Sequence, residues 1–191
     1  MCAHKFDPNK CDILDDPARW ERENPDQIWD VIGLQDARVV VDLGAGTGFF
    51  AFHFVRKLEP GVQVCAFDIS LQMLDKLKSN KGDGFSNVQP VQTGEAELPL
   101  KSGCVDLFYM SNLHHELDDR KRVLQEAYRV LSPGGKLAVW DWKKQDMEYG
   151  PPTDKRISGK VIENELSKQG FADVVFHDIL TYHNLFTASK R

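Results

Sequence analysis

Hydrophobic residues occur along this chain in two alternating patterns. From position 38 onward, short blocks of consecutive apolar residues, typical of buried strands, are followed by segments in which apolar residues recur every three or four positions, as on one face of a helix. The alternation predicts an α/β fold, a mostly parallel sheet with helices on both faces. The predicted strands are Val39–Leu43, Val62–Phe67, Val88–Val91, Val105–Met110 and Lys136–Trp140. The predicted helices are Phe49–Leu58, Leu71–Lys78, Asp118–Leu131 and Gly159–Lys168.

The last part of the chain departs from this alternation. Val174–Phe176 and Tyr182–Ala188 have strand patterns, and no segment of helix length separates them. We therefore expect these two strands to form an antiparallel pair at one edge of the sheet. In addition, Pro133-Gly134-Gly135 is expected to be a turn leading into the strand that begins at Lys136.

The N-terminal part has little periodicity. Residues 1–16 are polar and are expected to form an extended arm. Asn24-Pro25 then precedes a short amphipathic segment that ends at Gly33, which predicts a helix with an Asn cap, a Pro in the first turn and a terminating Gly. With 191 residues, the chain suits a single domain over 1–191, with an arm and cap helix at 1–37 and a core at 38–191.

Charge and hydropathy narrow the class of protein. The formal net charge is −5, and no dense stripe of Lys and Arg is present, so binding to a nucleic-acid backbone is not expected and small-molecule partners are favoured. The apolar runs have strand length, and no basic segment followed by a long apolar stretch opens the chain. We therefore expect a cytoplasmic protein without a membrane segment. A homodimer is compatible with the sequence, which does not determine the oligomeric state.

The four cysteines do not indicate a disulfide or a metal site. Cys65 and Cys104 fall in apolar runs, where a reduced core thiol is expected. The arm contains Cys2, His4 and Cys11, but their spacing matches no common zinc pattern, so no metal is predicted.

A glycine-rich turn is the most informative segment. Asp42 lies near the end of the first predicted strand, and Gly44, Gly46 and Gly48 follow before the next helix. Glycines at such a turn let a ligand approach the backbone without meeting a Cβ atom. By itself, the pattern also fits a tight loop between a strand and a helix.

An acidic residue after the second strand indicates what the ligand is. Asp68 can accept hydrogen bonds from both hydroxyls of a ribose, although it can also serve as a helix cap together with Ser70. A nucleoside is therefore predicted, which leaves S-adenosylmethionine (SAM) and nicotinamide or flavin nucleotides as candidates. Because Phe49 stands where a dinucleotide fingerprint has its third glycine, the pattern favours SAM.

Five motifs, in order, resemble the class I SAM-dependent methyltransferases, in particular the broad group that includes the ubiquinone/menaquinone biosynthesis methyltransferases. The motifs are Val41–Gly48, Phe67–Ser70 with Met73-Leu74, Gly94–Leu100, Val105–Leu107 and Val130–Gly135. This resemblance implies a single-domain Rossmann-like fold with a seven-stranded, mostly parallel sheet, an antiparallel edge strand and a reversed final strand. It also implies SAM as cofactor and methyl transfer as activity.

The resemblance also implies roles for individual residues. The three glycines would shape the methionine end of the cofactor site and Asp68 would hold the ribose, while Glu95 would lie near the adenine amine. Ser111 would face the methionine amino group through its carbonyl. The complete set of expected cofactor residues is Asp42, Gly44, Ala45, Gly46, Thr47, Gly48, Asp68, Ile69, Met73, Glu95, Ala96 and Ser111.

Two positions depart from the group. Its members usually have Asp where this chain has Glu95. The quinone enzymes usually carry Arg-Asn after the fourth strand, where this chain has Ser111-Asn112-Leu113-His114-His115, which argues against a quinone acceptor.

Candidate catalytic and acceptor-binding residues follow the fourth and fifth strands. Methyl transfer requires a base only when the acceptor carries a proton that must leave, and His is then the natural choice. His114 and His115 are therefore candidate catalytic residues, with a structural or capping role as the alternative. Trp142, Lys143 and Arg156 are the candidate residues of the acceptor site.

Three functions are compatible with these motifs. The first is an enzyme that methylates a small molecule, and we favour it. The second is a sensor or scaffold that binds SAM or S-adenosylhomocysteine without turnover, because the motifs indicate binding only. The third is methylation of a protein or RNA through a basic patch formed by Lys143, Lys144, Lys155, Arg156 and Lys160.

Overall fold

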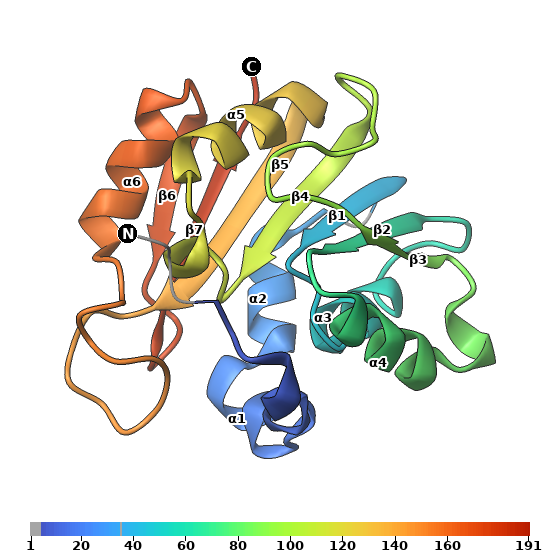
Figure 1. The fold of residues 1–191 in the computed structure, drawn as a ribbon. Coiled ribbons are helices and arrows are strands. Elements are labelled where there is room, and N and C mark those ends of the chain that lie inside the picture. Colours follow the sequence, from blue (N-terminus) through green and yellow to red (C-terminus); the bar gives the residue numbers. More distant parts are fainter. Residues whose placement is uncertain (1–4, 35) are drawn as a thin grey trace.

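The computed structural model describes residues 5–34 and 36–191. One seven-stranded sheet forms its centre, with the strand order β3-β2-β1-β4-β5-β7-β6 (Figure 1). The strands are β1 (Val39–Leu43), β2 (Gln63–Asp68), β3 (Val88–Gln92), β4 (Val105–Ser111), β5 (Leu131–Trp142), β6 (Ala172–His177) and β7 (His183–Ser189). The predicted strands are all present, with boundaries that differ by a few residues.

The sheet is mostly parallel. β1 pairs in parallel with β2 and β4, β2 with β3, and β4 with β5. β7 is the reversed strand, and it lies between β5 and the edge strand β6, antiparallel to both. The Rossmann-like fold class is confirmed, with its antiparallel pairing at one edge of the sheet.

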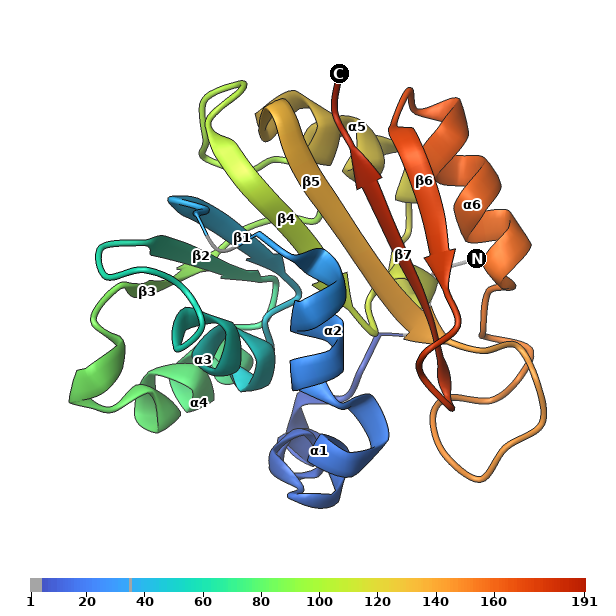
Figure 2. The same ribbon diagram turned by 180° about the vertical axis from the view of Figure 1, so that it is seen from behind.

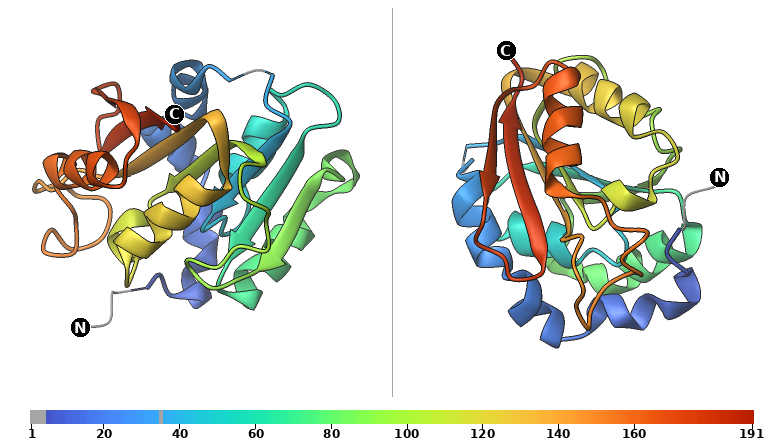
Figure 3. Two further views of the ribbon diagram at one scale, coloured as in Figure 1. Left: turned by 90° about the horizontal axis from the view of Figure 1, so that it is seen from above. Right: turned by 90° about the vertical axis from the view of Figure 1, so that its left-hand side faces the viewer.

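Helices cover both faces of the sheet (Figures 2 and 3). Residues of α2 and α3 pack on one face in a cluster that contains Trp140, and residues of α5 and α6 pack on the other in a cluster that contains Phe108. The helices are α1 (Ala18–Glu23), α2 (Pro25–Ile32), α3 (Phe49–Val55), α4 (Leu71–Lys81), α5 (Arg120–Val130) and α6 (Gly159–Lys168). Three short 3-10 helices are η1 (Pro8–Asp15), η2 (Asp83–Phe85) and η3 (His114–Glu116).

The helix predicted after Asn24 is present with its predicted caps. The Asn24 side chain accepts a hydrogen bond from the backbone N–H of Gln27, Pro25 opens α2, and Gly33 ends it in a left-handed conformation with φ of 58°.

Two expectations at the chain level were wrong. The polar N-terminal residues do not form an extended arm throughout, because η1 begins after Asp7, whose side chain accepts a hydrogen bond from the N–H of Asn9. Pro133–Gly135 lie within β5 rather than in a separate turn before it, because the backbones of Gly134 and Gly135 exchange hydrogen bonds with Lys190 just beyond β7.

The N-terminal segment that contains η1 and α1 lies across the carboxyl ends of the parallel strands. In Figure 1, α1 lies below the arrowheads of β1, β4 and β5, and η1 contacts α4. The contact with α4 includes a hydrogen bond from Gln72 Nε2 to the Pro8 carbonyl and an ion pair between Lys76 and Asp12. The segment from Lys5 to Asp15 therefore closes over the end of the sheet where α/β proteins bind ligands, and we refer to it as the N-terminal strap.

Among the described residues, no helix combines the length and the apolar content needed to cross a membrane.

Candidate active site

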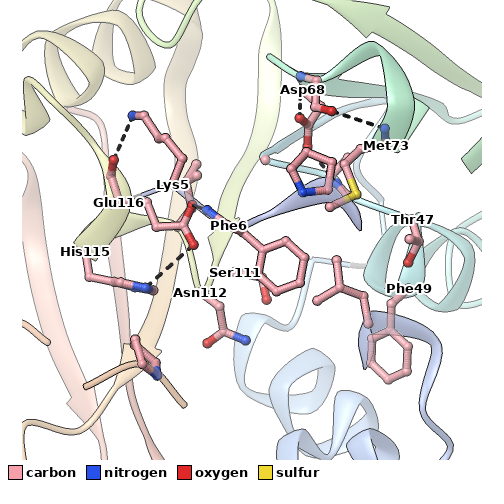
Figure 4. Close-up of a pocket in the computed structure, with 18 of the residues that line it drawn as sticks. Lys5, Phe6, Thr47, Phe49, Asp68, Met73, Ser111, Asn112, His115 and Glu116 are labelled. Carbon is pink, nitrogen blue, oxygen red and sulfur yellow. Dashed lines mark hydrogen bonds and ion pairs between the residues drawn. The ribbon is translucent and has the colours of Figure 1, made fainter. Parts of the chain in front are cut away.

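A cavity of about 750 Å³ lies between the carboxyl ends of the strands and the N-terminal strap. It is lined by the turn after β1, the start of the segment after β2, the turn after β4, the end of β5 and the loop before α6. Figure 4 shows some of these side chains, with Asp68 and Met73 on one side and His115 and Glu116 on the other. The cavity thus has a cofactor side and a second side with different chemistry.

The glycine-rich turn is fixed to the neighbouring strand. The backbone N–H groups of Gly44 and Ala45 both donate to the carbonyl of Phe67 at the end of β2, at 2.8 and 3.0 Å. Gly46 has a φ of 54°, and a Cβ atom there would lie 3.3 Å from a Leu14 methyl of the strap. Because the backbone approaches both β2 and the strap, glycine is required for this shape.

Asp68 holds the same turn from the other strand. Its Oδ2 accepts the N–H of Gly46 at 2.9 Å and its Oδ1 accepts the N–H of Ser70 at 2.8 Å. Burial raises the pKa of this carboxyl above its ordinary value. Each oxygen retains acceptor capacity after these bonds, because a carboxylate has about four lone-pair sites. The cap of α4 is Ser70, whose Oγ accepts the N–H of Met73 at 3.3 Å, so Asp68 does not serve as the cap and its remaining acceptor capacity is open to a ribose.

Asp42 lies beneath the turn. The side chain is buried, and burial raises its pKa to about 7, with a further contribution from the negative charge of Asp68. A carboxyl close to half-protonation at neutral pH limits the negative charge on this side of the cavity.

These residues fit an adenosyl ligand. The carboxylate of Asp68 can accept from a diol, the glycine turn leaves room for backbone approach, and Ile69 and Met73 offer apolar surface beside them. SAM, when bound, supplies a methyl group on a positively charged sulfur. The expected cofactor residues that line the cavity are Asp42, Gly44, Ala45, Gly46, Thr47, Asp68, Ile69, Met73, Glu95 and Ser111.

Two expected cofactor residues lie outside the cavity wall. Gly48 packs below the turn, where a Cβ would meet the Phe52 ring, and Ala96 lies by a smaller neighbouring hollow. Glu95 lines both spaces, and its carboxylate contacts Lys5 of the strap and accepts the N–H of Asp118 at 3.1 Å. The strap therefore contacts the residue expected near adenine.

On the second side of the cavity, the structure separates the two histidines. His115 lines the cavity, its Nδ1 lies 2.7 Å from Asp141 Oδ1, and its backbone N–H donates to Asp141 Oδ2 at 2.8 Å. His114 is fully buried outside the cavity wall, with Nε2 2.8 Å from Glu165 Oε2 of α6.

Arg120 of α5 binds the same carboxylate as His114, that of Glu165. Its guanidinium donates to both oxygens of Glu165, from Nε at 3.0 and 3.1 Å and from Nη2 at 2.9 Å. Although burial opposes the charged form, His114 and Arg120 lower the pKa of Glu165 to about 2. This ionic cluster attaches η3, which carries both histidines, to α5 and α6.

Asp141 is the buried hydrogen-bond partner of His115 and shifts its pKa. Burial favours the neutral forms of both groups, but their hydrogen bond outweighs it, so the pKa of Asp141 is lowered and the pKa of His115 is raised. The Nε2 atom of His115 lies 3.7 Å from Glu116 Oε1. Glu116 in turn accepts the backbone N–H of Phe6 at 2.9 Å, and burial raises its pKa.

Of the three candidate residues of the acceptor site, one lines the cavity and two lie outside its wall. Trp142 lines the cavity, with its ring centroid 4.2 Å from that of His183. Lys143 lies outside the cavity wall and pairs with Asp178 at 2.9 Å. Arg156 is buried outside the wall as well, and its guanidinium donates to four loop carbonyls, those of Lys143, Gln145, Tyr149 and Pro151.

Arg156 therefore supports the loop that forms part of the wall. Because its donors are used by these carbonyls, and Lys143 pairs with Asp178, two members of the expected basic patch do not offer a free charge to a protein or RNA acceptor. The contribution of Cys2 and His4 to a metal site lies outside the described residues; among those described, no group of three His, Cys, Asp or Glu side chains is arranged for a metal ion.

Sequence reasoning missed a buried network from α1. Arg19 Nε donates to Glu23 Oε1 at 2.5 Å, Glu23 Oε2 accepts Asn112 Nδ2 at 3.0 Å, and the Arg19 guanidinium lies 4.5 Å from the Phe49 ring centroid. These four residues line the cavity. The spacing of Arg19 and Glu23, four positions apart, was the only local signal.

Residues 41–139 match the model of a family described as a methyltransferase domain. The ubiquinone/menaquinone biosynthesis C-methyltransferase UbiE of Vibrio parahaemolyticus is 33% identical over 123 residues, which cover 62% of this chain and 47% of the relative. The chain spans about half the length of the curated relatives that it matches.

Solved structures agree with the fold. A SAM dependent methyltransferase from Aquifex aeolicus superimposes with a TM-score of 0.91 and 30% sequence identity, covering 96% of this chain and 98% of that chain. The phosphoethanolamine N-methyltransferase 2 of Haemonchus contortus, in complex with SAM, gives a TM-score of 0.75 at 15% identity, covering 88% of this chain and 52% of that chain. The second likeness concerns the fold alone.

Proposed function

Because this chain belongs to the family of class I SAM-dependent methyltransferases, we propose that it binds SAM in the cavity and transfers the methyl group to a small molecule. The observation that carries the proposal is the cavity itself. It joins the glycine turn and Asp68 on one side to His115 and Trp142 on the other, under one strap. Its volume of about 750 Å³ is in the upper part of the range for small-molecule sites, roughly 300–1,000 Å³, so that two small reactants fit.

The residues of the chain contribute chiefly by positioning. Asp68 and the glycine turn would hold the nucleoside end of the cofactor, and the strap would exclude water from above. A small acceptor is favoured because the strap and the loop held by Arg156 enclose the second side of the cavity. A sensor that only binds SAM would not need the buried partner of His115 at the wall, which favours an enzyme over the non-catalytic alternative.

Calorimetric titration with SAM and S-adenosylhomocysteine tests cofactor binding. We expect micromolar binding for the wild type and at least tenfold weaker binding for Asp68→Ala, because two hydrogen bonds to a carboxylate are lost. Asp68→Asn serves as the conservative variant, since it retains acceptor capacity and part of the turn structure.

Asp75→Ala is the matched control. Asp75 is an exposed carboxylate on α4 that pairs with Lys78 at 3.0 Å and lies outside the cavity wall. Its loss should leave the affinity unchanged. A folded wild-type protein that binds neither ligand, or equal affinities in the Asp68 and Asp75 variants, would contradict the proposal.

A further inference from the structure

His115 has the environment of a general base. Its Nδ1 is engaged by the buried carboxylate of Asp141, which fixes the proton on Nδ1 and leaves Nε2 as the acceptor when the ring is neutral. Asp141 is fully buried and also accepts the backbone N–H of His115, so the orientation of the ring and of the turn are set by the same group.

The turn that carries His115 is held from behind. His114, Glu165 and Arg120 connect η3 to α6 and α5, away from the cavity. The two adjacent histidines therefore have separate tasks: His114 anchors the turn, and His115 faces the space where an acceptor can bind. Structural capping explains His114 but leaves the buried Asp141 beside a cavity-facing ring unexplained.

We propose, on the basis of the function proposed above, that the acceptor is methylated at a hydroxyl oxygen or an activated carbon whose proton is removed by His115, with Asp141 as the positioning residue. A neutral amine already has a free lone pair and needs no base before transfer. A thiol, with an ordinary pKa of about 8.5, already forms some of the reactive thiolate near neutral pH without a base. A hydroxyl or a C–H group requires a base, and this is the class of acceptor for which a buried His–Asp pair is useful.

The step balances. The acceptor proton passes to His115 Nε2, and the electron pair left on the acceptor oxygen or carbon forms the bond to the methyl carbon. The bond between that carbon and the cofactor sulfur breaks, its electron pair stays on sulfur, and S-adenosylhomocysteine is released. Asp141 stabilises the imidazolium, with Glu116 3.7 Å from Nε2, until the proton is lost to solvent.

Charged groups from three elements act on His115. Asp141 of β5 and Glu116 of η3 favour the imidazolium, and Arg156 of the loop before α6 opposes it. Burial lowers the pKa of His115, but the hydrogen bond to Asp141 and the nearby carboxylates outweigh it and raise the pKa, so the neutral base predominates only above this raised value. The rate at low acceptor concentration should therefore fall as the pH decreases through the pKa of His115.

The first test does not require the acceptor. In the complex with S-adenosylhomocysteine, long-range ¹⁵N NMR should find the neutral ring of His115 protonated on Nδ1 with Nε2 bare. In Asp141→Asn, the proton should move to Nε2. A wild-type ring that in its neutral form carries the proton on Nε2 would overturn the proposal.

The second test identifies the acceptor atom. The protein is incubated with SAM carrying a CD₃ group and a small-molecule cell extract, and labelled products are identified by mass spectrometry. We expect the label on oxygen or carbon, with formation at least 100-fold slower in His115→Asn, which retains an N–H donor toward Asp141. His177→Asn, on the remote strand β6, is the control.

The outcomes separate this proposal from the proposed function. Three results would overturn the proposed acceptor class. They are a label on nitrogen or sulfur, an unchanged rate in His115→Asn, and SAM binding without any product labelled on oxygen or carbon. Absence of SAM binding in the wild type would instead overturn the proposed function.

Discussion

Gly48 illustrates how a single residue shapes the cofactor turn from below. It has a φ of 91°, and a Cβ atom at this position would lie 2.5 Å from Cε2 of Phe52. Both the backbone conformation and the neighbouring ring therefore oppose any side chain. Gly134 has a similar φ of 80°, but no atom lies within 4 Å of the position of its Cβ.

These two glycines form a matched pair for mutation. Gly134→Ala should cost only the conformational penalty, about 1–2 kcal/mol of unfolding free energy. Gly48→Ala should cost about 2–4 kcal/mol, because overpacking against Phe52 is added. Urea unfolding measures both, and equal losses in the two variants would contradict the steric explanation.

Single residues differed in how well the sequence predicted them. Asp68 lies at the cavity wall, as its place directly after the second strand of an α/β fold indicates, and its role as ribose ligand stays a prediction. His114 and His115 were predicted as a pair, but adjacent positions carry no information about which ring faces a cavity. The role of Arg156 as a support for the loop was not predictable, because its acceptors are backbone carbonyls that any sequence provides.

At the scale of elements, α5, η3 and α6 are joined by the cluster of Arg120, His114 and Glu165. The pKa of Glu165 is lowered to about 2 from an ordinary 4.5 by His114 and Arg120, against the effect of burial. A carboxyl with a depressed folded pKa contributes stability that is fully present above pH 4.5 and is lost as the pH falls toward 2. The upper bound of this contribution is about 3 kcal/mol.

Glu165→Gln should therefore remove part of the acid sensitivity. We expect a less stable protein at pH 7 and a smaller decrease in unfolding free energy between pH 5 and pH 3 than in the wild type, measured by urea titration. Glu163→Gln, at an exposed position on the same helix, is the control and should follow the wild-type profile. An unchanged profile in Glu165→Gln would show that the cluster does not stabilise the folded state.

Elements with local signals were predicted and those that depend on distant contacts were not. The caps of α2 are encoded by Asn24, Pro25 and Gly33 within a short segment, and the prediction was confirmed. η1 and α1 were missed because their residues have weak periodicity and are held by contacts to α4 and to the turn after β4. The extension of β5 through Pro133 depends on pairing with the chain end beyond β7, which has no signature near Pro133.

For the whole molecule, the cavity connects segments far apart in the sequence. Its wall contains the strap, the turns after β1 and β2, and the loop before α6. A ligand that bridges these parts should reduce their local opening. We expect hydrogen exchange to slow in residues 7–15, 44–48 and 68–73 when S-adenosylhomocysteine binds, and to remain unchanged in residues 172–177 of β6. Protection confined to 44–48 would mean that the strap does not contact the ligand.

The position of β7 has a consequence for synthesis on the ribosome. Of the strands in this sheet, β7 is the last to be made, yet it lies between β5 and β6 and provides a hydrogen-bonding partner for each. Until it emerges, β5 has an open edge and β6 has no strand to join. The sheet is therefore complete only after His183–Ser189 have been translated, and a ribosome that stalls before His183 leaves the free edge of β5 exposed to aggregation.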